Sequence, residues 1–358
     1  MKILILGFTK IKFMPYLKFY IDSLLENNEL ELVYWNRDGK EDIKTDNKIV
    51  LHEFGYIQKD EVKKIKKLKA FYKYRKYVKK IIKNEDFDRI IVLHTLPGIL
   101  LLDILIKKYS NKYILDYRDF TYENVKIYKK MIEKLVINAK LTLVSSEAYR
   151  KYLPKLDNIY TIHNVLLEPI DYKVNENNEN TKRHIVIRFW GFIRHEKINK
   201  EIIKKISQDN RFELHYHGRE QQTANNLKEF CKEIKAKNIF FHGEYMPDER
   251  YKFARDTDLL HNIYENDTAT VLAMGNKYYD GLIFNIPQIC NKNSFMGKCV
   301  TKNEIGIELD PYDDDFLNDL YKYYSSIDRS KIKEKSEKEL ERILAQNKQT
   351  KENVIKEF

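Results

Sequence analysis

Short apolar runs alternate with longer polar segments along the first half of the chain. The runs are rich in Ile, Leu and Val, and the segments between them place apolar residues at helical spacing. Buried parallel strands joined by helical crossovers produce this alternation. The pattern therefore predicts a doubly wound α/β domain over residues 1–168. Its predicted strands lie in KILILG, LELVYW, NKIVLHEF, DRIIVLHT, KYILDYRD, LTLVSS and NIYTIHNV.

A polar interruption rich in Asn and Glu separates this half from a second series of apolar runs. We predict a linker over 169–183, a second α/β domain over 184–329, and one or two surface helices in the charged tail 330–358. The fold class is thus α/β, with two domains facing across a cleft at the carboxyl ends of their strands. The later strands are predicted in HIVIRFWGF, RFELHYHG, NIFFHGEY, TDLLHNIY and IPQIC.

Composition favours a globular protein in a reducing compartment. The 358 residues suit two domains of ordinary size, and 43% hydrophobic with 33% charged residues argues against disorder. Cys231, Cys290 and Cys299 show no CxxC spacing, which argues against a disulfide framework and a thiolate zinc site. No run approaches the roughly 18 apolar residues of a spanning helix. We expect a cytoplasmic protein.

The net charge of +11 has two explanations. It can mark an anionic partner, or it can follow from a composition rich in Lys, Asn, Ile and Tyr. No RNP, helix-turn-helix or zinc signature is present, so we expect no nucleic-acid partner. The basic segment 60–83 has apolar residues at helical spacing among Lys, Arg and aromatic residues. It suits an anionic membrane surface, or equally a solvated helix whose apolar stripe packs on a sheet.

The segment WGFIRHEK combines a glycine with two cations directly after a predicted buried strand. Gly191 allows a ligand to approach the backbone, and Arg194 and Lys197 follow in the loop that opens at the strand's carboxyl end. Two cations at this position suit a diphosphate. An ordinary solvated loop in a Lys-rich protein is the alternative.

Three further segments follow this one: LHYHG, NIFFHGEYM and NKYYDGLIFNIPQIC. In this order the four segments resemble the donor-binding domain of GT-B glycosyltransferases, in particular the family 4-like glycosyl transferases group 1. The resemblance implies a GT-B architecture of two Rossmann-like domains, with Gly191, Arg194 and Lys197 on the diphosphate of a nucleotide sugar. Gly218 would end the next strand, and the segment that contains Tyr245 would pass the base.

The resemblance gives Asp280 the place of an acid that accepts hydrogen bonds from the ribose hydroxyls, for which an acceptor-only carboxylate is suited. A helix beginning near Asn276 would direct its free amides at the phosphates, and Lys277 would add a point charge. Leu272 departs from the family pattern, where an acid helps to hold the donor sugar. Thr268 in YENDTAT is a possible substitute. The alternative for Asp280 is an ordinary polar helix position.

In the first half, the resemblance places LDYRDFTYE where a His or an acid approaches the transferred sugar. Asp119 is the first catalytic candidate, with Asp116 and His94 behind it, and Lys10 lies in the loop after the first strand. For each acid and for His94, the alternative is a polar residue that caps the next helix.

We expect no metal ion and no cofactor. The histidines lack the spacing of paired metal ligands, and the alternation of His215 and His217 along one strand offers no third ligand. The cationic role therefore falls to Arg194 and Lys197, in agreement with the metal independence that the resemblance implies.

These observations together predict a glycosyltransferase that moves a sugar from a nucleotide diphosphate donor, with a UDP-sugar expected, to a glycan or lipid-linked glycan acceptor. A capsule, cell-wall or glycoprotein glycan is the expected product. The resemblance implies retention at the anomeric carbon, whereas Asp119 acting purely as a base would suit inversion. Two alternatives remain: a nucleotide-sugar epimerase of the same fold, and a non-catalytic subunit that binds a glycan or a partner transferase.

Overall fold

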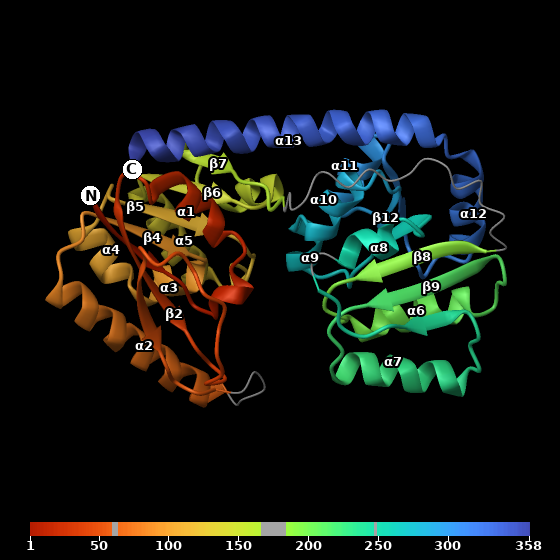
Figure 1. The fold of residues 1–358 in the computed structure, drawn as a ribbon, viewed down its shortest axis with the longest axis horizontal. Coiled ribbons are helices and arrows are strands. Elements are labelled where there is room, and N and C mark those ends of the chain that lie inside the picture. Colours follow the sequence, from red (N-terminus) through yellow and green to blue (C-terminus); the bar gives the residue numbers. More distant parts are fainter. Residues whose placement is uncertain (59–63, 166–183, 247–248) are drawn as a thin grey trace. The chain divides into compact units, whose positions relative to one another are not determined.

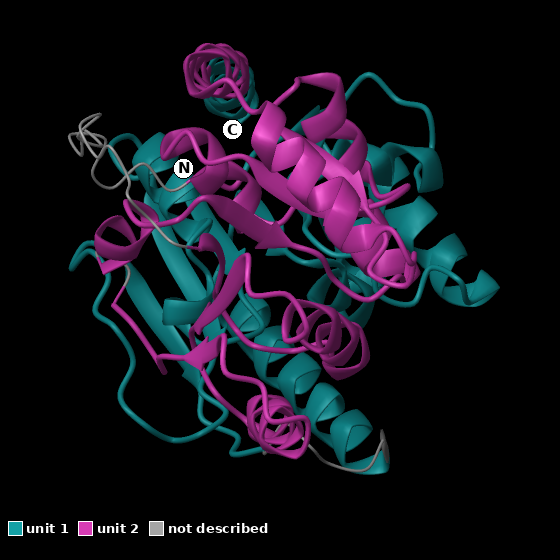
Figure 2. Cartoon of the chain, turned by 90° about the vertical axis from the view of Figure 1, so that its right-hand side faces the viewer, with its two compact units in different colours: residues 1–163, 345–358 teal, residues 164–344 magenta. Residues whose placement is uncertain are grey.

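The computed structural model describes residues 1–58, 64–165, 184–246 and 249–358. The chain divides into two compact units (Figure 2). Unit 1 comprises residues 1–163 and 345–358, and unit 2 comprises residues 164–344. The predicted linker 169–183 lies outside the described residues.

Unit 1 is built on a parallel sheet of seven strands in the order β3-β2-β1-β4-β5-β6-β7 (Figure 1). Each of the seven predicted runs contains one of these strands, and every neighbouring pair is parallel. The strands are β1 (Lys2–Leu6), β2 (Glu29–Trp35), β3 (Val50–Phe54), β4 (Arg89–Leu93), β5 (Tyr113–Tyr117), β6 (Leu141–Val144) and β7 (Ile159–Thr161).

The helices of unit 1 connect these strands, as the alternation predicts. Their apolar faces pack on aliphatic strand residues, so that Leu17, Tyr20 and Leu24 of the first α-helix join Ile3 and Ile91 in one buried cluster. The helices are η1 (Ile11–Phe13), α1 (Leu17–Leu24), α2 (Lys64–Asn84), α3 (Thr95–Leu100), α4 (Leu102–Lys108), α5 (Lys126–Asn138) and η2 (Glu147–Tyr152).

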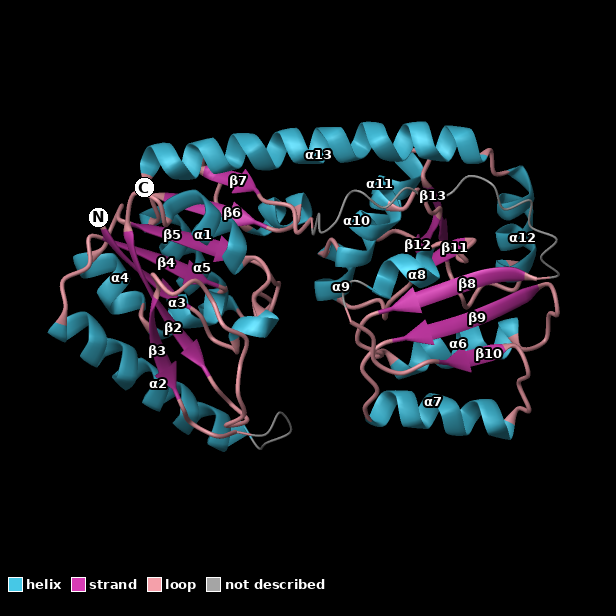
Figure 3. Cartoon of the chain, viewed as in Figure 1, coloured by secondary structure: helices cyan, strands magenta, loops and turns pink. Residues whose placement is uncertain are grey.

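Unit 2 contains a parallel sheet of six strands in the order β10-β9-β8-β11-β12-β13 (Figure 3). The five predicted runs contain five of them. The sixth, Gly306–Leu309, was not predicted, because it is a short and half-buried edge strand without a continuous apolar run. The strands are β8 (Ile185–Trp190), β9 (Phe212–His217), β10 (Ile239–Phe241), β11 (Leu259–Asn262), β12 (Gln288–Asn291) and β13 (Gly306–Leu309).

The helix that follows β8 shows why this sheet forms. Its residues Ile198, Ile202 and Ile206 recur at helical spacing and pack against Ile187 and Leu214 of the sheet. The helices are α6 (Glu196–Ile206), α7 (Gln222–Glu233), α8 (Arg250–Ala254), α9 (Thr268–Leu272), α10 (Asn276–Ile283), α11 (Phe295–Lys302) and α12 (Phe316–Ser326).

The tail forms one 29-residue helix, α13 (Arg329–Glu357), which begins in unit 2 and ends in unit 1. Ile343 is fully buried, and Tyr278 donates a hydrogen bond to Glu339 at 3.1 Å. At the other end Val354 is fully buried, and Thr350 donates to the carbonyl of Thr161 at 2.8 Å. The tail is therefore part of the packing of each unit as well as a surface helix.

Candidate functional site

Two glycines hold together the loops that follow β8 and β9. Gly191 and Gly218 have φ values of +123° and +146°, which L side chains rarely adopt. A Cβ on Gly218 would lie 1.7 Å from the carbonyl oxygen of Gly191. The Gly191 amide donates to the carbonyl of His217 at 2.9 Å, and the Gly218 amide donates to that of Gly243 at 2.7 Å. Backbone contact between these loops fixes the start of the segment that carries Arg194 and Lys197.

Arg194 and Lys197 flank the beginning of α6, and both side chains are exposed. The Lys197 amide lies 3.3 Å from the carboxylate of Glu265, to which it donates. Between the two cations, His195 occupies the left-handed region at φ 66° and its ring packs against Tyr264 with centroids 5.6 Å apart. The structure thus presents two basic side chains at the positive end of a helix dipole, an arrangement suited to an anion.

Lys277 lies in the first turn of α10 and is only 7% exposed. Its Nζ sits 3.9 Å from the ring centroid of Phe189 on β8 and 4.7 Å from that of Tyr264. Burial, reinforced by the nearby charge of Arg194, lowers the pKa of Lys277 to about 7, although Asp280 opposes the shift. The predicted cations Arg194 and Lys277 are therefore electrostatic neighbours at the carboxyl ends of β8 and β11.

Asp280 is 4% exposed, and both of its oxygens contact protein groups. Oδ2 accepts a hydrogen bond from Trp190 Nε1 at 2.7 Å, and Oδ1 pairs with Arg250 Nη1 at 2.8 Å. Burial raises its pKa, and Arg250 is the main opposing influence. This carboxylate ties α10 to β8 and α8. The role of Asp280 on a ribose stays a prediction, which requires it to use its remaining lone pairs.

The other predicted donor residues lie on loops and helix starts of the same unit. Tyr245 follows β10 and contacts the ring of Phe253 edge-on, and burial raises its pKa to about 12. Thr268 begins α9 directly after Asp267, which caps that helix. Asn276 begins α10 and accepts a hydrogen bond from Asn164 at 2.8 Å. Their contact with a nucleotide sugar stays a prediction.

A cavity of about 270 Å³ opens beside Lys197 in unit 2. Its lining mixes polar side chains with Ile198 and Leu309, and comes from the beginning of α6 and the ends of β11, β12 and β13. It includes Glu265, Asn266 and Asp267 from the YENDTAT segment, together with Asn291, Lys292, Asp310 and Tyr312. A lining of amides, carboxylates and a phenol suits a ligand rich in hydroxyl groups.

In unit 1 the structure brings together two of the predicted residues, His94 and Asp119. His94 Nδ1 lies 3.3 Å from Asp119 Oδ2, and the hydroxyl of Tyr16 is hydrogen-bonded to His94 Nε2. Because a carboxylate only accepts, Nδ1 carries the proton and Nε2 accepts from Tyr16. His94 adopts φ 71°, an uncommon conformation for a residue other than glycine. Side-chain exposure rises from 26% for His94 to 65% for Asp119, so the dyad reaches solvent.

Asp116 and Lys10, by contrast, are buried and engaged in structural contacts. Asp116 is fully buried, pairs with Arg118 at 2.6 Å and accepts from Tyr20 at 2.8 Å. The Lys10 ammonium donates to Asp38 at 2.7 Å and to the carbonyls of Lys40 and Glu41 at 2.9 and 3.1 Å. Lys10 thereby holds a loop that lines a hollow of about 410 Å³. Their roles toward an acceptor stay predictions.

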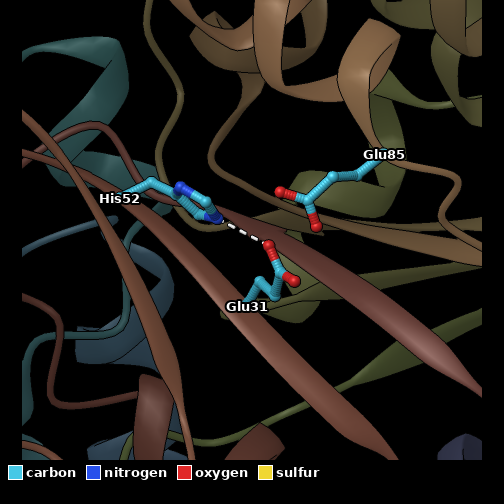
Figure 4. A group of neighbouring side chains, drawn as sticks. All are labelled: Glu31, His52 and Glu85. Atoms are coloured by element: carbon cyan, nitrogen blue, oxygen red, sulfur yellow. Dashed lines mark hydrogen bonds and ion pairs between the residues drawn. The ribbon is translucent and has the colours of Figure 1, made fainter.

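Among the described residues, one group has the composition of a metal site: Glu31, His52 and Glu85, whose ligand atoms lie within 4.8 Å of one another (Figure 4). His52 Nε2 is 2.5 Å from Glu31, but the Lys2 ammonium also pairs with Glu31 at 2.8 Å and with Glu85. The two acids raise the pKa of Lys2. The ammonium supplies the positive charge that a metal would bring, so the group is best explained as an ion-pair network.

His215 and His217 take part in a ring stack instead of a metal site. The rings of His217 and His242 are nearly parallel, with centroids 4.2 Å apart. The ring of Phe253 also stacks on that of His217, with a centroid distance of 4.2 Å. Burial is the first cause that lowers the pKa of His215 to about 4 and of His217 to about 3. Both rings are therefore neutral near pH 7.

Helix α2 packs on the sheet with one face and exposes apolar side chains on another. Ala70, Tyr74 and Val78 are fully buried, which is the expected packing on the sheet. Ile65 and Leu68, however, are 80% and 65% exposed, and Tyr72 is also exposed among the lysines. In the described part of the chain, no helix is both long enough and apolar enough to span a membrane.

Comparison with solved structures identifies the fold. The chain is similar to a sucrose-phosphate synthase from Thermosynechococcus elongatus, with 10% identity, a TM-score of 0.73 and coverage of 96% of this chain and 94% of the other. It is similar to a glycosyltransferase from Rickettsia africae, with 13% identity, a TM-score of 0.69 and coverage of 99% and 98%. The Anabaena protein HepE, solved in complex with UDP-glucose, matches with 13% identity, a TM-score of 0.67 and 99% coverage of both chains.

The chain has the GT-B fold. The predicted α/β class with two Rossmann-like sheets is thereby confirmed. No protein-family model matches the chain, and no curated protein matches its sequence. At the identities above, the likeness is one of fold.

Several residues of these sites were not predicted from the sequence. Arg250, which pairs with Asp280, comes from α8 and belongs to none of the motifs found in the sequence. Tyr16 precedes α1 and lies far along the chain from His94. The GT-B fold brings such residues together because successive parallel strands end at the same sheet edge.

Proposed function

We propose that this protein is a glycosyltransferase whose unit 2 binds the nucleotide diphosphate of a sugar donor. The proposal rests on the meeting of Arg194, Lys277 and the beginnings of α6 and α10 at the carboxyl ends of β8 and β11. The donor is a nucleotide sugar, with a UDP-sugar as the first candidate. The complex of HepE with UDP-glucose, on the same fold, supports this choice.

The proposed chemistry is stabilisation of a leaving diphosphate. As the bond between sugar and phosphate breaks, negative charge grows on the phosphate oxygens. Cations and amides that are held in place before the reaction stabilise that charge, and removal of one comparable donor costs about 2.7–4 kcal/mol in other enzymes. Arg194 and Lys197 take this role, and the reaction is proposed to need no metal ion.

In unit 1, the dyad of His94 and Asp119 is the proposed group for proton transfer. Asp119 is the more exposed member and is proposed to accept the proton of the acceptor hydroxyl, while His94 and Tyr16 hold it in position. Action of Asp119 as a base suits inversion, whereas the family resemblance implies retention. The anomer of the product, determined by NMR, separates the two outcomes.

The proposed acceptor is a glycan or lipid-linked glycan of the capsule or cell-wall type, reached from the cytoplasmic face of the membrane. The support is the exposed stripe of Ile65, Leu68 and Tyr72 among the lysines of α2, which suits an anionic lipid surface. Substitution of all three residues by Ser is expected to abolish co-sedimentation with vesicles that contain phosphatidylserine. The matched control replaces three exposed residues elsewhere in unit 1, Ile127, Ile137 and Ile355. Equal binding by both variants would remove this part of the proposal.

A second candidate is a non-catalytic subunit that retains the fold. Two observations favour it: Leu272 stands where the family has an acid, and both oxygens of Asp280 are engaged within the protein. This candidate predicts no hydrolysis or transfer of any nucleotide sugar, alone or with acceptor glycans.

Calorimetric titration with UDP, GDP, ADP and dTDP tests the donor site. One diphosphate is expected to bind the wild type, and Arg194→Ala is expected to lose at least about tenfold in affinity, since each lost charge-assisted hydrogen bond is worth about 1.5–3 kcal/mol. Lys298→Ala on the exposed side of α11 is the matched control. If no diphosphate binds the wild type, the proposed donor site is wrong.

A further inference from the structure

Lys277 is a buried lysine without an obvious counter-charge. Lysine is almost never buried this deeply unless it is paired. Yet its Nζ makes no hydrogen bond or ion pair with the part of the chain that the structure describes, and its contacts are the faces of Phe189 and Tyr264. Cation–π contact compensates only part of the cost of burying an ammonium group. Burial without a counter-charge thus disfavours the charged form of this side chain.

The groups around Lys277 do not supply the missing negative charge. Arg194, from the loop after β8, repels it. Asp280, one turn further along α10, directs its oxygens to Trp190 and Arg250. Four other titratable groups lie around Lys277, and burial and neighbouring charge shift the pKa of each. These are His195 before α6, His261 on β11, Tyr264 after β11 and Cys290 on β12.

The remaining groups are uncharged near neutral pH. Burial raises the pKa of the Cys290 thiol and of the Tyr264 phenol, so neither forms an anion there. Burial is the largest cause that lowers the pKa of His195 and of His261, the latter to about 3. His195 Nε2 is moreover buried without a hydrogen-bond partner among the described residues. This orphaned atom is a second polar group near Lys277 whose hydrogen-bonding capacity the described residues leave unused.

An anion at the beginnings of α6 and α10 would favour the charged form of Lys277 over the neutral form. It would supply the counter-charge that the described residues do not, and it would offset the repulsion by Arg194. Such a ligand favours the ammonium form of Lys277, whereas an uncharged ligand at the same place does not.

We propose that Lys277 is a proton-linked recognition residue for the donor, which above neutral pH is mostly an uncharged amine before a diphosphate binds and takes up one proton from solvent when it does. The proton adds to the Nζ lone pair, and it returns to solvent when the diphosphate leaves. The inference rests on the proposed function, since it assumes that the anion is the diphosphate of the donor. Through this proton uptake, Lys277 distinguishes a diphosphate from a neutral nucleoside.

Proton uptake can be measured directly by calorimetry. UDP, or the tightest diphosphate of the panel above, is titrated into the full chain at pH 8 in buffers that differ in ionisation enthalpy. At this pH an amine with a pKa of about 7 is about 90% neutral, and the terminal phosphate, with a pKa of about 6, is ionised. We expect an uptake close to one proton per diphosphate bound. Affinity should fall about tenfold between pH 8 and pH 9.

Lys277→Arg is the decisive variant, because arginine stays protonated throughout this range. It is expected to bind the diphosphate with no proton uptake and no loss of affinity between pH 8 and pH 9. Lys277→Met keeps the length of the side chain without the charge, and it should lose at least tenfold in affinity. Lys298→Arg on α11 is the matched control and should behave as the wild type. Uridine, which has no phosphate, should cause no uptake.

The outcomes separate this inference from the proposed function. Binding of a diphosphate without proton uptake, or uptake that persists in Lys277→Arg, would overturn the inference and leave the donor site standing. Absence of binding by every diphosphate would overturn the proposed donor site itself. If Lys277→Arg does not fold, NMR of ¹³Cε-labelled lysine provides an independent measurement. One resonance of the wild type, absent in Lys277→Met, should titrate near pH 7 and shift to higher pH with the diphosphate; a Lys277 resonance that stays charged to pH 9 without ligand overturns the inference.

Discussion

Each unit contains a buried ion pair at its sheet edge, but the residues that form it come from different elements. Each has a buried aspartate near the carboxyl edge of its sheet, ion-paired with an arginine and hydrogen-bonded to an aromatic side chain. In unit 1 these are Asp116, Arg118 and Tyr20. In unit 2 they are Asp280, Arg250 and Trp190.

The difference lies in which elements each pair connects. Asp116 lies near the end of β5 and pairs with a residue two positions away, so its ion pair is local and only Tyr20 comes from another element, α1. Asp280 joins a helix, a strand and a second helix through Trp190 and Arg250. A buried carboxylate thus joins a strand and the loop after it to one helix in unit 1, and joins its own helix to a strand and a second helix in unit 2. Buried charge at a sheet edge does not by itself identify a ligand contact.

The largest effects are expected from breaking these pairs. Arg250→Met leaves Asp280 buried without its cation and should destabilise unit 2 by about 3–5 kcal/mol, as should Arg118→Met in unit 1. Adding Asp280→Asn or Asp116→Asn to the respective variant removes the unpaired charge and should recover most of the loss. Urea denaturation of all four proteins measures this. A loss below about 1 kcal/mol in Arg250→Met would show that Asp280 does not depend on Arg250.

Variants of the two units should differ more clearly in their kinetics than in their stability. With a donor and acceptor identified, Asp119→Asn is expected to lower kcat by 10²–10⁴-fold, the usual range for a general base, with diphosphate affinity unchanged. Arg194→Ala is expected to weaken diphosphate binding and to lower kcat/KM by about 10²–10³-fold. Kinetics and calorimetry on the same two variants test this division. Loss of diphosphate binding in Asp119→Asn would contradict it.

A glycine comparison isolates the backbone contact that only unit 2 uses. Gly218→Ala should destabilise unit 2 by more than about 1–3 kcal/mol, since the methyl group meets the Gly191 carbonyl as well as adding strain at positive φ. Gly191→Ala is the matched control, because no atom lies within 4 Å of its Cβ position and only the strain remains. Thermal denaturation compares the two. Equal losses would mean that the close approach of the loops is relaxed easily.

Acid is expected to destabilise unit 2 through His215 and His217. His215 and His217 have pKa values of about 4 and about 3 in the folded state, below their ordinary value near 6.5. Between these values the unfolded chain binds more protons, so the stability of unit 2 should fall as pH decreases from 6.5 toward 4. Thermal melts of wild type and His217→Phe measure the slope. An unchanged slope in the variant would assign the acid sensitivity to other groups.

Much of the fold could be predicted because burial dictates composition. Among the described residues, twelve of the thirteen strands coincide with apolar runs, because most strands bury the majority of their side chains. Gly306–Leu309 does not, because Gly306 and Glu308 leave it without a continuous apolar run. Gly191, Arg194 and His94 were also accessible to prediction, because residues that directly follow a strand in this fold class gather at one edge.

What the sequence determined by itself is therefore the α/β class, the division of strands and helices, and the segments that carry cations and acids. Only the tertiary structure decided how each charge is used: Asp280 pairs with Arg250, Lys10 donates to Asp38, and His94 meets both Asp119 and Tyr16. The burial of Lys277 against the rings of Phe189 and Tyr264 is likewise visible only in the tertiary structure. Hydrophobic periodicity is a local property that the chain carries along its length. The partner and the burial of a charge depend on residues far away in sequence, which only the packed fold brings within reach.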